Sequence, residues 1–208
     1  MDRKDIKLSE AREYFTIGKA AETSTNIKGS IFISHCAHVA TANEAMDYIK
    51  SIRIKHIDAT HNCWAYRISP NEYRFNDDGE PSGTAGQPIF QALLGANLEQ
   101  TCIVVTRYYG GTKLGAGGLA RAYGGGAVAV LKEAKTLLVK PMITLLIEVS
   151  FSEQNSLFHF LQSHPEITTT TDYTATGIQI KASFYLSDRN KIVELLTNSL
   201  RGRVQITE

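Results

Sequence analysis

The last third of the chain carries the clearest pattern of apolar and polar positions. Met142–Phe151 and Gly177–Leu186 place apolar side chains at alternate positions, which is typical of strands with one buried face. After Asp188, apolar side chains recur at helical spacing, which predicts a helix with Asp188 as its N-cap. The remaining predicted elements are a helix capped by Ser152 and strands at Ile167–Thr174 and Val204–Thr207. The order β-α-β-β-α-β is that of the ferredoxin-like fold.

Strands and helices also alternate in the first two thirds of the chain, but less regularly. Thr101–Tyr109 is a strongly apolar strand, and the segments around it predict a mixed α/β domain. The other predicted strands are Ser30–Val39, Asn62–Ile68 and Tyr73–Phe75, the last two forming a hairpin. The predicted helices are Asn43–Ile54, Thr84–Leu98 with Pro88 in its first turn, and Gly118–Leu131. The fold class predicted for the whole chain is therefore α+β.

Composition separates the two parts of the chain. The 208 residues are 43% hydrophobic and 21% charged with a formal net charge of +1, which excludes a disordered protein and a globally basic nucleic-acid binder. Twelve of the 16 glycines lie between Gly79 and Gly126, and the excess of basic over acidic residues is confined to the part before Pro141. We therefore predict two domains, at residues 1–138 and 139–208.

Cysteine and histidine usage argues against a disulfide framework and against a zinc site. Three cysteines are too few for such a framework, which favours a reducing, cytoplasmic compartment. His35 and His38 would point to opposite faces of their strand, although both lie near Cys36. No stretch is apolar enough to span a membrane, and the amino terminus lacks a secretory signal. We expect no bound metal, no cofactor and no membrane association.

A glycine-rich segment is the most informative part of the sequence. From Thr101 to Lys132 there is no acidic residue, while a strand, a glycine-rich loop and a helix follow one another. Such a loop exposes backbone N–H groups at the positive end of a helix, which suits a phosphate. The candidate nucleic-acid- or phosphate-binding residues are Arg107, Tyr108, Gly110, Gly111, Lys113, Gly117, Gly118 and Arg121. The alternative is that these glycines serve only turns and helix packing and that the charges are ordinary solvated ones.

Three carboxylates crowd into a short segment before this loop. Asp77, Asp78 and Glu80 form a possible acidic or Mg²⁺ site, because Mg²⁺ prefers carboxylate oxygens. The alternative is a turn at Asp78-Gly79 followed by a helix start at Ser82 or Thr84, and this is the interpretation we favour. No dinucleotide fingerprint or Walker A loop is complete, and no catalytic residue can be named.

Two long motifs give the chain a family resemblance. The sequence Asp78-Gly-Glu-Pro-Ser-Gly-Thr-Ala-Gly and the segment Arg107–Tyr123 resemble the signature of the Impact family, in its bacterial YigZ-type form. Tyr109 stands where phenylalanine is commoner in that family. The resemblance implies an Impact N-terminal domain, similar in fold to domain 2 of a small-subunit ribosomal protein, followed by a ferredoxin-like βαββαβ domain. Eukaryotic members act in translational control through an additional domain, and this chain is expected to start directly with the Impact domain.

These observations favour binding over catalysis. We expect a non-catalytic protein that binds RNA or the ribosome and regulates translation. One alternative is a Mg²⁺-dependent enzyme acting on a phosphorylated small molecule, with Asp77, Asp78 and Glu80 holding the metal. A second alternative is a docking adaptor for a protein partner in translation control, with the exposed sheet face of the C-terminal half as its surface.

Overall fold

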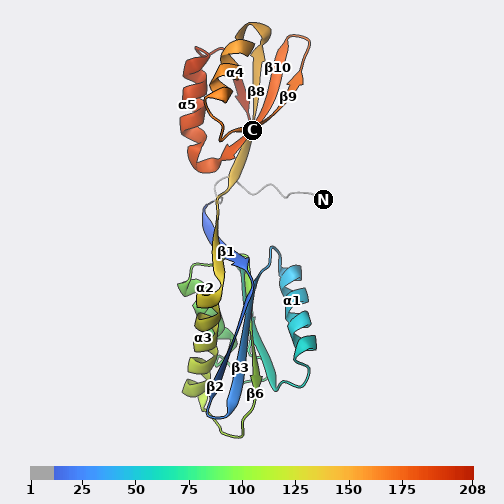
Figure 1. Cartoon of the computed structure of the whole chain (residues 1–208), viewed down its shortest axis with the longest axis vertical. Coiled ribbons are helices and arrows are strands. Elements are labelled where there is room, and N and C mark those ends of the chain that lie inside the picture. Colours follow the sequence, from blue (N-terminus) through green and yellow to red (C-terminus); the bar gives the residue numbers. More distant parts are fainter. Residues whose placement is uncertain (1–11) are drawn as a thin grey trace. The chain divides into compact units, whose positions relative to one another are not determined.

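The computed structural model describes residues 12–208, which divide into two compact units (Figure 1). One unit is Tyr14–Val139, and the other is Lys140–Glu208 together with residues 12 and 13. The boundary that the distribution of glycine and charge predicts lies at residue 138. Residues 1–11 of the predicted first domain lie outside the described residues.

The first unit is built on a five-stranded antiparallel sheet of order β2-β3-β6-β4-β5. The strands are β2 (Ala21–Ile27), β3 (Ser30–His38), β4 (His61–Ser69), β5 (Glu72–Asn76) and β6 (Thr101–Tyr108). Strand β6 occupies the centre of the sheet, and its first seven residues are all buried, including the polar Thr101 and Thr106 and the charged Arg107. The predicted hairpin is present as β4 and β5.

Helices cover both faces of this sheet (Figure 1). They are α1 (Ala42–Lys55) on one face and α2 (Gly86–Gly95) with α3 (Ala116–Glu133) on the other. Strand β4 contributes alternate side chains to the hydrophobic cores on the two faces of the sheet. Cys63 and Ala65 belong to the core under α2 and α3, whereas Trp64 and Tyr66 belong to the core under α1. Pro88 is the third residue of α2, so it lies in the first turn as predicted.

A two-stranded ribbon completes the first unit and was not predicted. Strand β1 (Tyr14–Lys19) pairs antiparallel with β7 (Lys135–Val139), and Tyr14 lies opposite Val139. All but one of the β7 residues are exposed, so this segment lacks the alternation that marks a half-buried strand. Its pairing partner lies more than a hundred residues away in the sequence.

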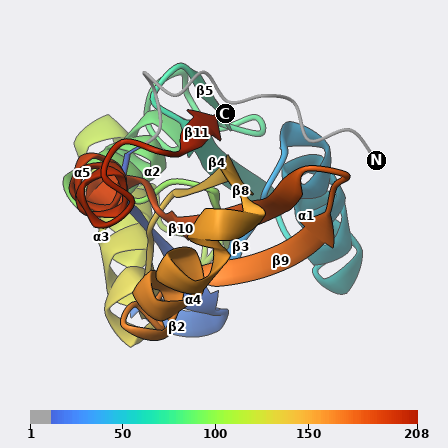
Figure 2. The same cartoon turned by 90° about the horizontal axis from the view of Figure 1, so that it is seen from above.

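The second unit has the predicted ferredoxin-like fold. Its elements are β8 (Met142–Ser150), α4 (Gln154–Gln162), β9 (Thr168–Tyr173), β10 (Gly177–Tyr185), α5 (Arg189–Ser199) and β11 (Gln205–Thr207). The strands form an antiparallel sheet of order β11-β8-β10-β9, and Figure 2 shows β8, β10 and β9 next to one another from above. Both helices bury their apolar residues in the single core that lines one face of this sheet.

Two details of the helix starts differ from the prediction. Ser152 lies inside a short 3-10 turn, Phe151–Glu153, and α4 begins only after Glu153, so Ser152 is not its N-cap. The Ser152 hydroxyl instead lies 2.7 Å from Ser150 Oγ. Asp188 does occupy the N-cap position of α5, but its side chain makes no capping hydrogen bond. In residues 12–208, no helix is long and apolar enough to cross a membrane.

Candidate functional site

The two motifs singled out in the sequence meet at one end of the five-stranded sheet. Strand β4 begins at His61, directly opposite Arg107 near the end of β6, and Ile31 near the start of β3 lies opposite Tyr108. The segment that follows β5 and the loop between β6 and α3 therefore lie at the same end. We refer to residues 77–85 as the acidic loop and to residues 109–115 as the glycine loop.

A buried ion pair ties the acidic loop to β6 and α3. Arg107 Nη1 donates a hydrogen bond of 2.7 Å to Glu80 Oε1, and the Tyr123 hydroxyl donates another of 2.7 Å to the same oxygen. Arg107 and Glu80 are only 5% and 8% exposed. The Arg107 guanidinium also lies over the rings of Phe32 and Tyr109, 5.5 and 5.3 Å from their centroids. Arg107 is thus an internal support under Tyr109, and its charge is already neutralised by Glu80.

The two aspartates also have partners within the protein. The Asp77 carboxylate accepts hydrogen bonds from the backbone N–H groups of Gly83, Ala85 and Gly86, so it holds the start of α2. Asp78 accepts from the N–H of Asn62 and pairs with Arg53. The carboxylates of the acidic loop therefore point to separate partners. Within the described part of the chain, no three His, Cys, Asp or Glu side chains are grouped so as to hold a metal ion.

The acidic loop contains the predicted turn, but its helix begins later than expected. Asp78 and Gly79 have φ values of 45° and 89°, which places the turn where the Asp-Gly pair predicts it. Helix α2 starts at Gly86, beyond both Ser82 and Thr84. Gly86 is required because a Cβ there would lie 2.7 Å from the backbone nitrogen of Asn76. The capping group is the side chain of Asp77, nine residues earlier, which no local cap signal would reveal.

The glycine loop is anchored at its base and exposed beyond it. Backbone N–H groups of Tyr109 and Gly110 donate to Thr60 Oγ1 and Ser30 Oγ, at 3.0 and 3.1 Å. A Cβ on Gly110 would lie 1.9 Å from the carbonyl carbon of Gly29, so only glycine fits this crossing. From Tyr109 to Lys113 every residue is exposed. The loop is therefore a fixed projection with an accessible backbone.

The first turn of α3 brings two of the predicted residues together. Its N-cap is Gly115, which offers no side-chain cap, and the first turn contains no acidic residue. A Cβ added to Gly117 would lie 3.5 Å from Arg121 Nη1, so the Arg121 guanidinium lies against the start of its own helix. Lys113 is exposed in the loop just before that turn. Of the three predicted cations, Lys113 and Arg121 are presented to solvent, and Arg107 is buried.

Tyr108 belongs to a hydrogen-bonded chain on the α1 face of the sheet. Its hydroxyl lies 3.0 Å from His56 Nδ1, His56 Nε2 lies 3.1 Å from His35 Nε2, and His35 Nδ1 lies 3.2 Å from the Glu22 carboxylate. The two facing Nε2 atoms share one hydrogen bond, so one of these two histidines donates to the other through Nε2. Burial lowers the pKa of His35 to about 4, so its imidazole is neutral at pH 7.

Sequence reasoning missed this chain because its members come from four separate segments. The remaining histidines that lie near cysteines are also used internally. His38 Nδ1 lies 2.8 Å from Thr16 Oγ1, and His61 Nδ1 lies 2.7 Å from the carbonyl oxygen of Asp78. Burial raises the pKa of the Cys63 thiol, so it remains protonated.

The similarity to known proteins includes both loops of the candidate site. A model of the Impact N-terminal domain matches residues 28–131, which include the acidic loop, the glycine loop and most of α3. The chain belongs to the Impact family. The IMPACT family member YvyE of Bacillus subtilis is 53% identical over 113 residues, or 53% of this chain and 52% of that protein. The IMPACT family member YigZ of Escherichia coli is 38% identical over 131 residues, or 61% of this chain and 64% of that protein.

The likeness extends to a solved structure as well. A crystal structure described as that of a hypothetical protein superposes with a TM-score of 0.65 at 29% identity, over 93% of this chain and 96% of that chain. The alignments with YvyE and YigZ span less than two thirds of each relative. The Impact domain is thus the best-defined common part, and it carries the candidate site.

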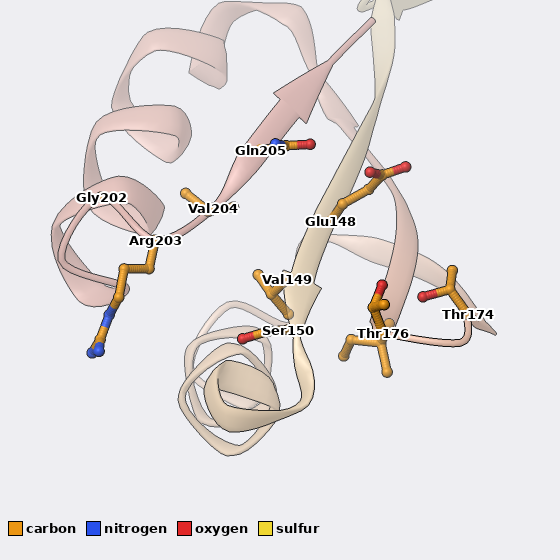
Figure 3. Close-up of a pocket in the computed structure, with 10 residues that line it drawn as sticks. Glu148, Val149, Ser150, Thr174, Thr176, Gly202, Arg203, Val204 and Gln205 are labelled. Atoms are coloured by element: carbon orange, nitrogen blue, oxygen red, sulfur yellow. The ribbon is translucent and has the colours of Figure 1, made fainter.

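A cavity of about 440 Å³ in the second unit lies outside the Impact match (Figure 3). Glu148, Thr174 and Thr176 line one side of it, but the Glu148 carboxylate is hydrogen-bonded to Gln179. Arg203 points away from Glu148 in Figure 3, and its guanidinium pairs with Glu153 at 3.3 Å. The charged side chains of this cavity therefore do not converge on a ligand, and the end of the first unit remains the better candidate.

Proposed function

We propose that this Impact-family chain binds the phosphates of RNA, free or in the ribosome, and regulates translation in the cytoplasm without catalysing a reaction. One observation carries the proposal. An exposed, acid-free glycine loop leads into an uncapped helix, with Lys113 in the loop and Arg121 against the first helical turn. The backbone N–H groups at the positive end of this helix and the two exposed cations together form a phosphate-binding arrangement.

An exposed aromatic ring extends this arrangement from phosphate to nucleotide. Tyr109 is 47% exposed, and its ring is supported by the buried Arg107 guanidinium at 5.3 Å. A supported ring beside a phosphate site offers a base a surface on which to stack, and single-stranded RNA supplies both groups. The pairing of an aromatic ring with cations therefore favours RNA over a small phosphate ion.

The neighbouring carboxylates do not cancel this attraction. Glu80 is paired with Arg107, and Asp78 is paired with Arg53, so each negative charge has a positive one beside it. Asp77 is engaged by three backbone N–H groups. A nucleic-acid backbone approaching the glycine loop thus meets less repulsion than three adjacent acidic residues suggest.

The same contacts weaken the enzyme alternative. A Mg²⁺ site built from Asp77, Asp78 and Glu80 would have to break a buried ion pair and detach the start of α2. Docking of a protein partner at this end has one feature in its favour, because Ile54 and Ile57 near the end of α1 are 66% and 81% exposed. Binding of this chain to a purified protein that carries no RNA would support docking as its function.

The test is the affinity for a fluorescent single-stranded RNA of mixed sequence, measured by anisotropy, and for purified ribosomes, measured by co-sedimentation. The double variant Lys113→Ala/Arg121→Ala should weaken binding about tenfold or more, because it removes both exposed cations from the loop and helix start. Arg107 is left intact, since its removal would disturb the fold.

The matched control is Lys50→Ala/Lys132→Ala. It removes the same charge from α1 and from the other end of α3, and both lysines are exposed. This control should bind like the unmodified chain. An equal loss of RNA affinity in both double variants would show that only the overall charge of the protein matters. An unchanged RNA affinity in K113A/R121A would refute the proposed site.

A further inference from the structure

We propose that strand β5 pairs with the β5 strand of a second copy of this chain, joining two five-stranded sheets edge to edge. The sheet ends in two edge strands, β2 and β5. An edge strand presents unpaired backbone N–H and C=O groups and therefore attracts another strand unless it is shielded. All five residues of β5, Glu72–Asn76, are exposed, and the strand contains neither proline nor lysine.

The side chains around β5 form an apolar surface on both faces of the strand. Tyr73 and Phe75 are 46% and 40% exposed, and both rings stack on Phe90 of α2, with centroids 4.5 and 5.7 Å apart. On the other face, Met46 and Trp64 line a cavity of about 490 Å³ beside the strand. Exposed apolar groups that flank a free edge mark an interaction surface.

The opposite edge of the sheet lacks these features. The exposed residues of β2 are Glu22, Ser24 and Asn26, all of them polar. Glu22 is also tied to Lys55 by an ion pair of 2.6 Å. The two edges differ in chemistry although they belong to the same sheet, and only β5 is suited to adding a strand.

The charges on β5 select a second copy of the same strand. Glu72 and Arg74 are two positions apart in β5 and therefore lie on the same face of the strand. Neither forms an ion pair with another residue in the part of the chain that the structure describes. In an antiparallel pair centred on Tyr73, Glu72 of each copy lies opposite Arg74 of the other, which gives two ion pairs related by a two-fold axis.

Other registers of the same pairing are less favourable. A pair centred on Arg74 would place two arginines directly opposite one another, which destabilises a strand pair. The register centred on Tyr73 instead brings the two Tyr73 rings together on the α2 face. Charge and aromatic side chains thus favour one closed, two-fold arrangement.

The test is the mass of the full chain in solution, by sedimentation equilibrium over a concentration series up to about 100 µM. The unmodified chain should approach twice its own mass. Glu72→Arg and Arg74→Glu should each raise the dimer dissociation constant about tenfold or more, since each places like charges across both pairs. The exchanged variant E72R/R74E should restore dimerisation, because the two ion pairs re-form with reversed direction.

Glu133→Arg, an equal change of charge at an exposed site on α3, serves as the control and should dimerise normally. Thermal melting of each variant separates a loss of pairing from a loss of folding. A chain that stays monomeric throughout, a dimer unaffected by E72R, or an exchanged variant no better than the single ones would each overturn the proposal. The surface is separate from the glycine loop, so this result does not depend on RNA binding.

Discussion

At the scale of single residues, the same side-chain chemistry serves opposite purposes in this molecule. Arg107, Lys113 and Arg121 look equivalent in the sequence, since all three lie in one acid-free segment. In the structure Arg107 is 5% exposed and paired with Glu80, while Lys113 and Arg121 are exposed. The difference depends on Glu80, which lies 27 positions away. The sequence around the three cations cannot show which of them forms an ion pair with a carboxylate so far away in the chain.

Removing Arg107 should therefore damage stability. Arg107→Met should lower the free energy of unfolding by about 3–5 kcal/mol, because it leaves the Glu80 carboxylate buried without its counter-charge. Glu80→Gln/Arg107→Met should recover a large part of that loss, since the amide still accepts from the Tyr123 hydroxyl and carries no charge. Urea unfolding of the two variants measures both values. A loss below about 1 kcal/mol in Arg107→Met would show that the pair contributes little.

At the scale of elements, the position of the glycine loop is set by two backbones in close contact. Gly110 crosses Gly29 so closely that a Cβ would overlap the backbone at 1.9 Å, whereas a Cβ on Gly125 in α3 would meet no atom within 4 Å. Both residues look alike in a glycine-rich sequence. One fixes the loop that presents Lys113, and the other is a replaceable position in a helix.

These two glycines should respond in opposite ways to the same substitution. Gly110→Ala should destabilise the chain by about 1–3 kcal/mol, because the loop and the turn at Gly29 must move apart. Gly125→Ala should stabilise it by about 0.5–1 kcal/mol, as alanine favours the helix. Thermal or urea unfolding of the pair checks the prediction. Equal effects of the two substitutions would contradict the contact seen between Gly110 and Gly29.

At the scale of the whole molecule, the sequence best predicts those helices and strands whose structure is specified by residues adjacent in the chain. The second unit follows its pattern nearly element by element, because alternation in Gly177–Tyr185 and helical spacing in Arg189–Ser199 specify strand and helix locally. The ribbon of β1 and β7 was missed because Tyr14 and Val139 meet only in the folded chain. The capping of α2 by Asp77 and the His56–His35 contact were missed for the same reason.

The predicted site was limited in the same way. The sequence supplied the segment, the acid-free helix start and the three cations. It gave no means of separating the buried Arg107 from the exposed Lys113 and Arg121, or of pairing each carboxylate of the acidic loop with its own partner. Most of those assignments depend on contacts between residues far apart in the chain, such as Asn62 with Asp78, 16 positions apart, and Glu80 with Tyr123, 43 positions apart.

The most direct test of the central claim is the salt dependence of RNA binding by the full chain. Each phosphate contact on a single strand contributes about 0.7 to the slope of log affinity against log salt concentration. Removing Lys113 and Arg121 together should lower that slope by about 1.4 relative to the unmodified chain, while K50A/K132A should leave it unchanged. Identical slopes for the unmodified chain and K113A/R121A would show that these two side chains do not contact phosphate, and the proposed RNA site would be wrong.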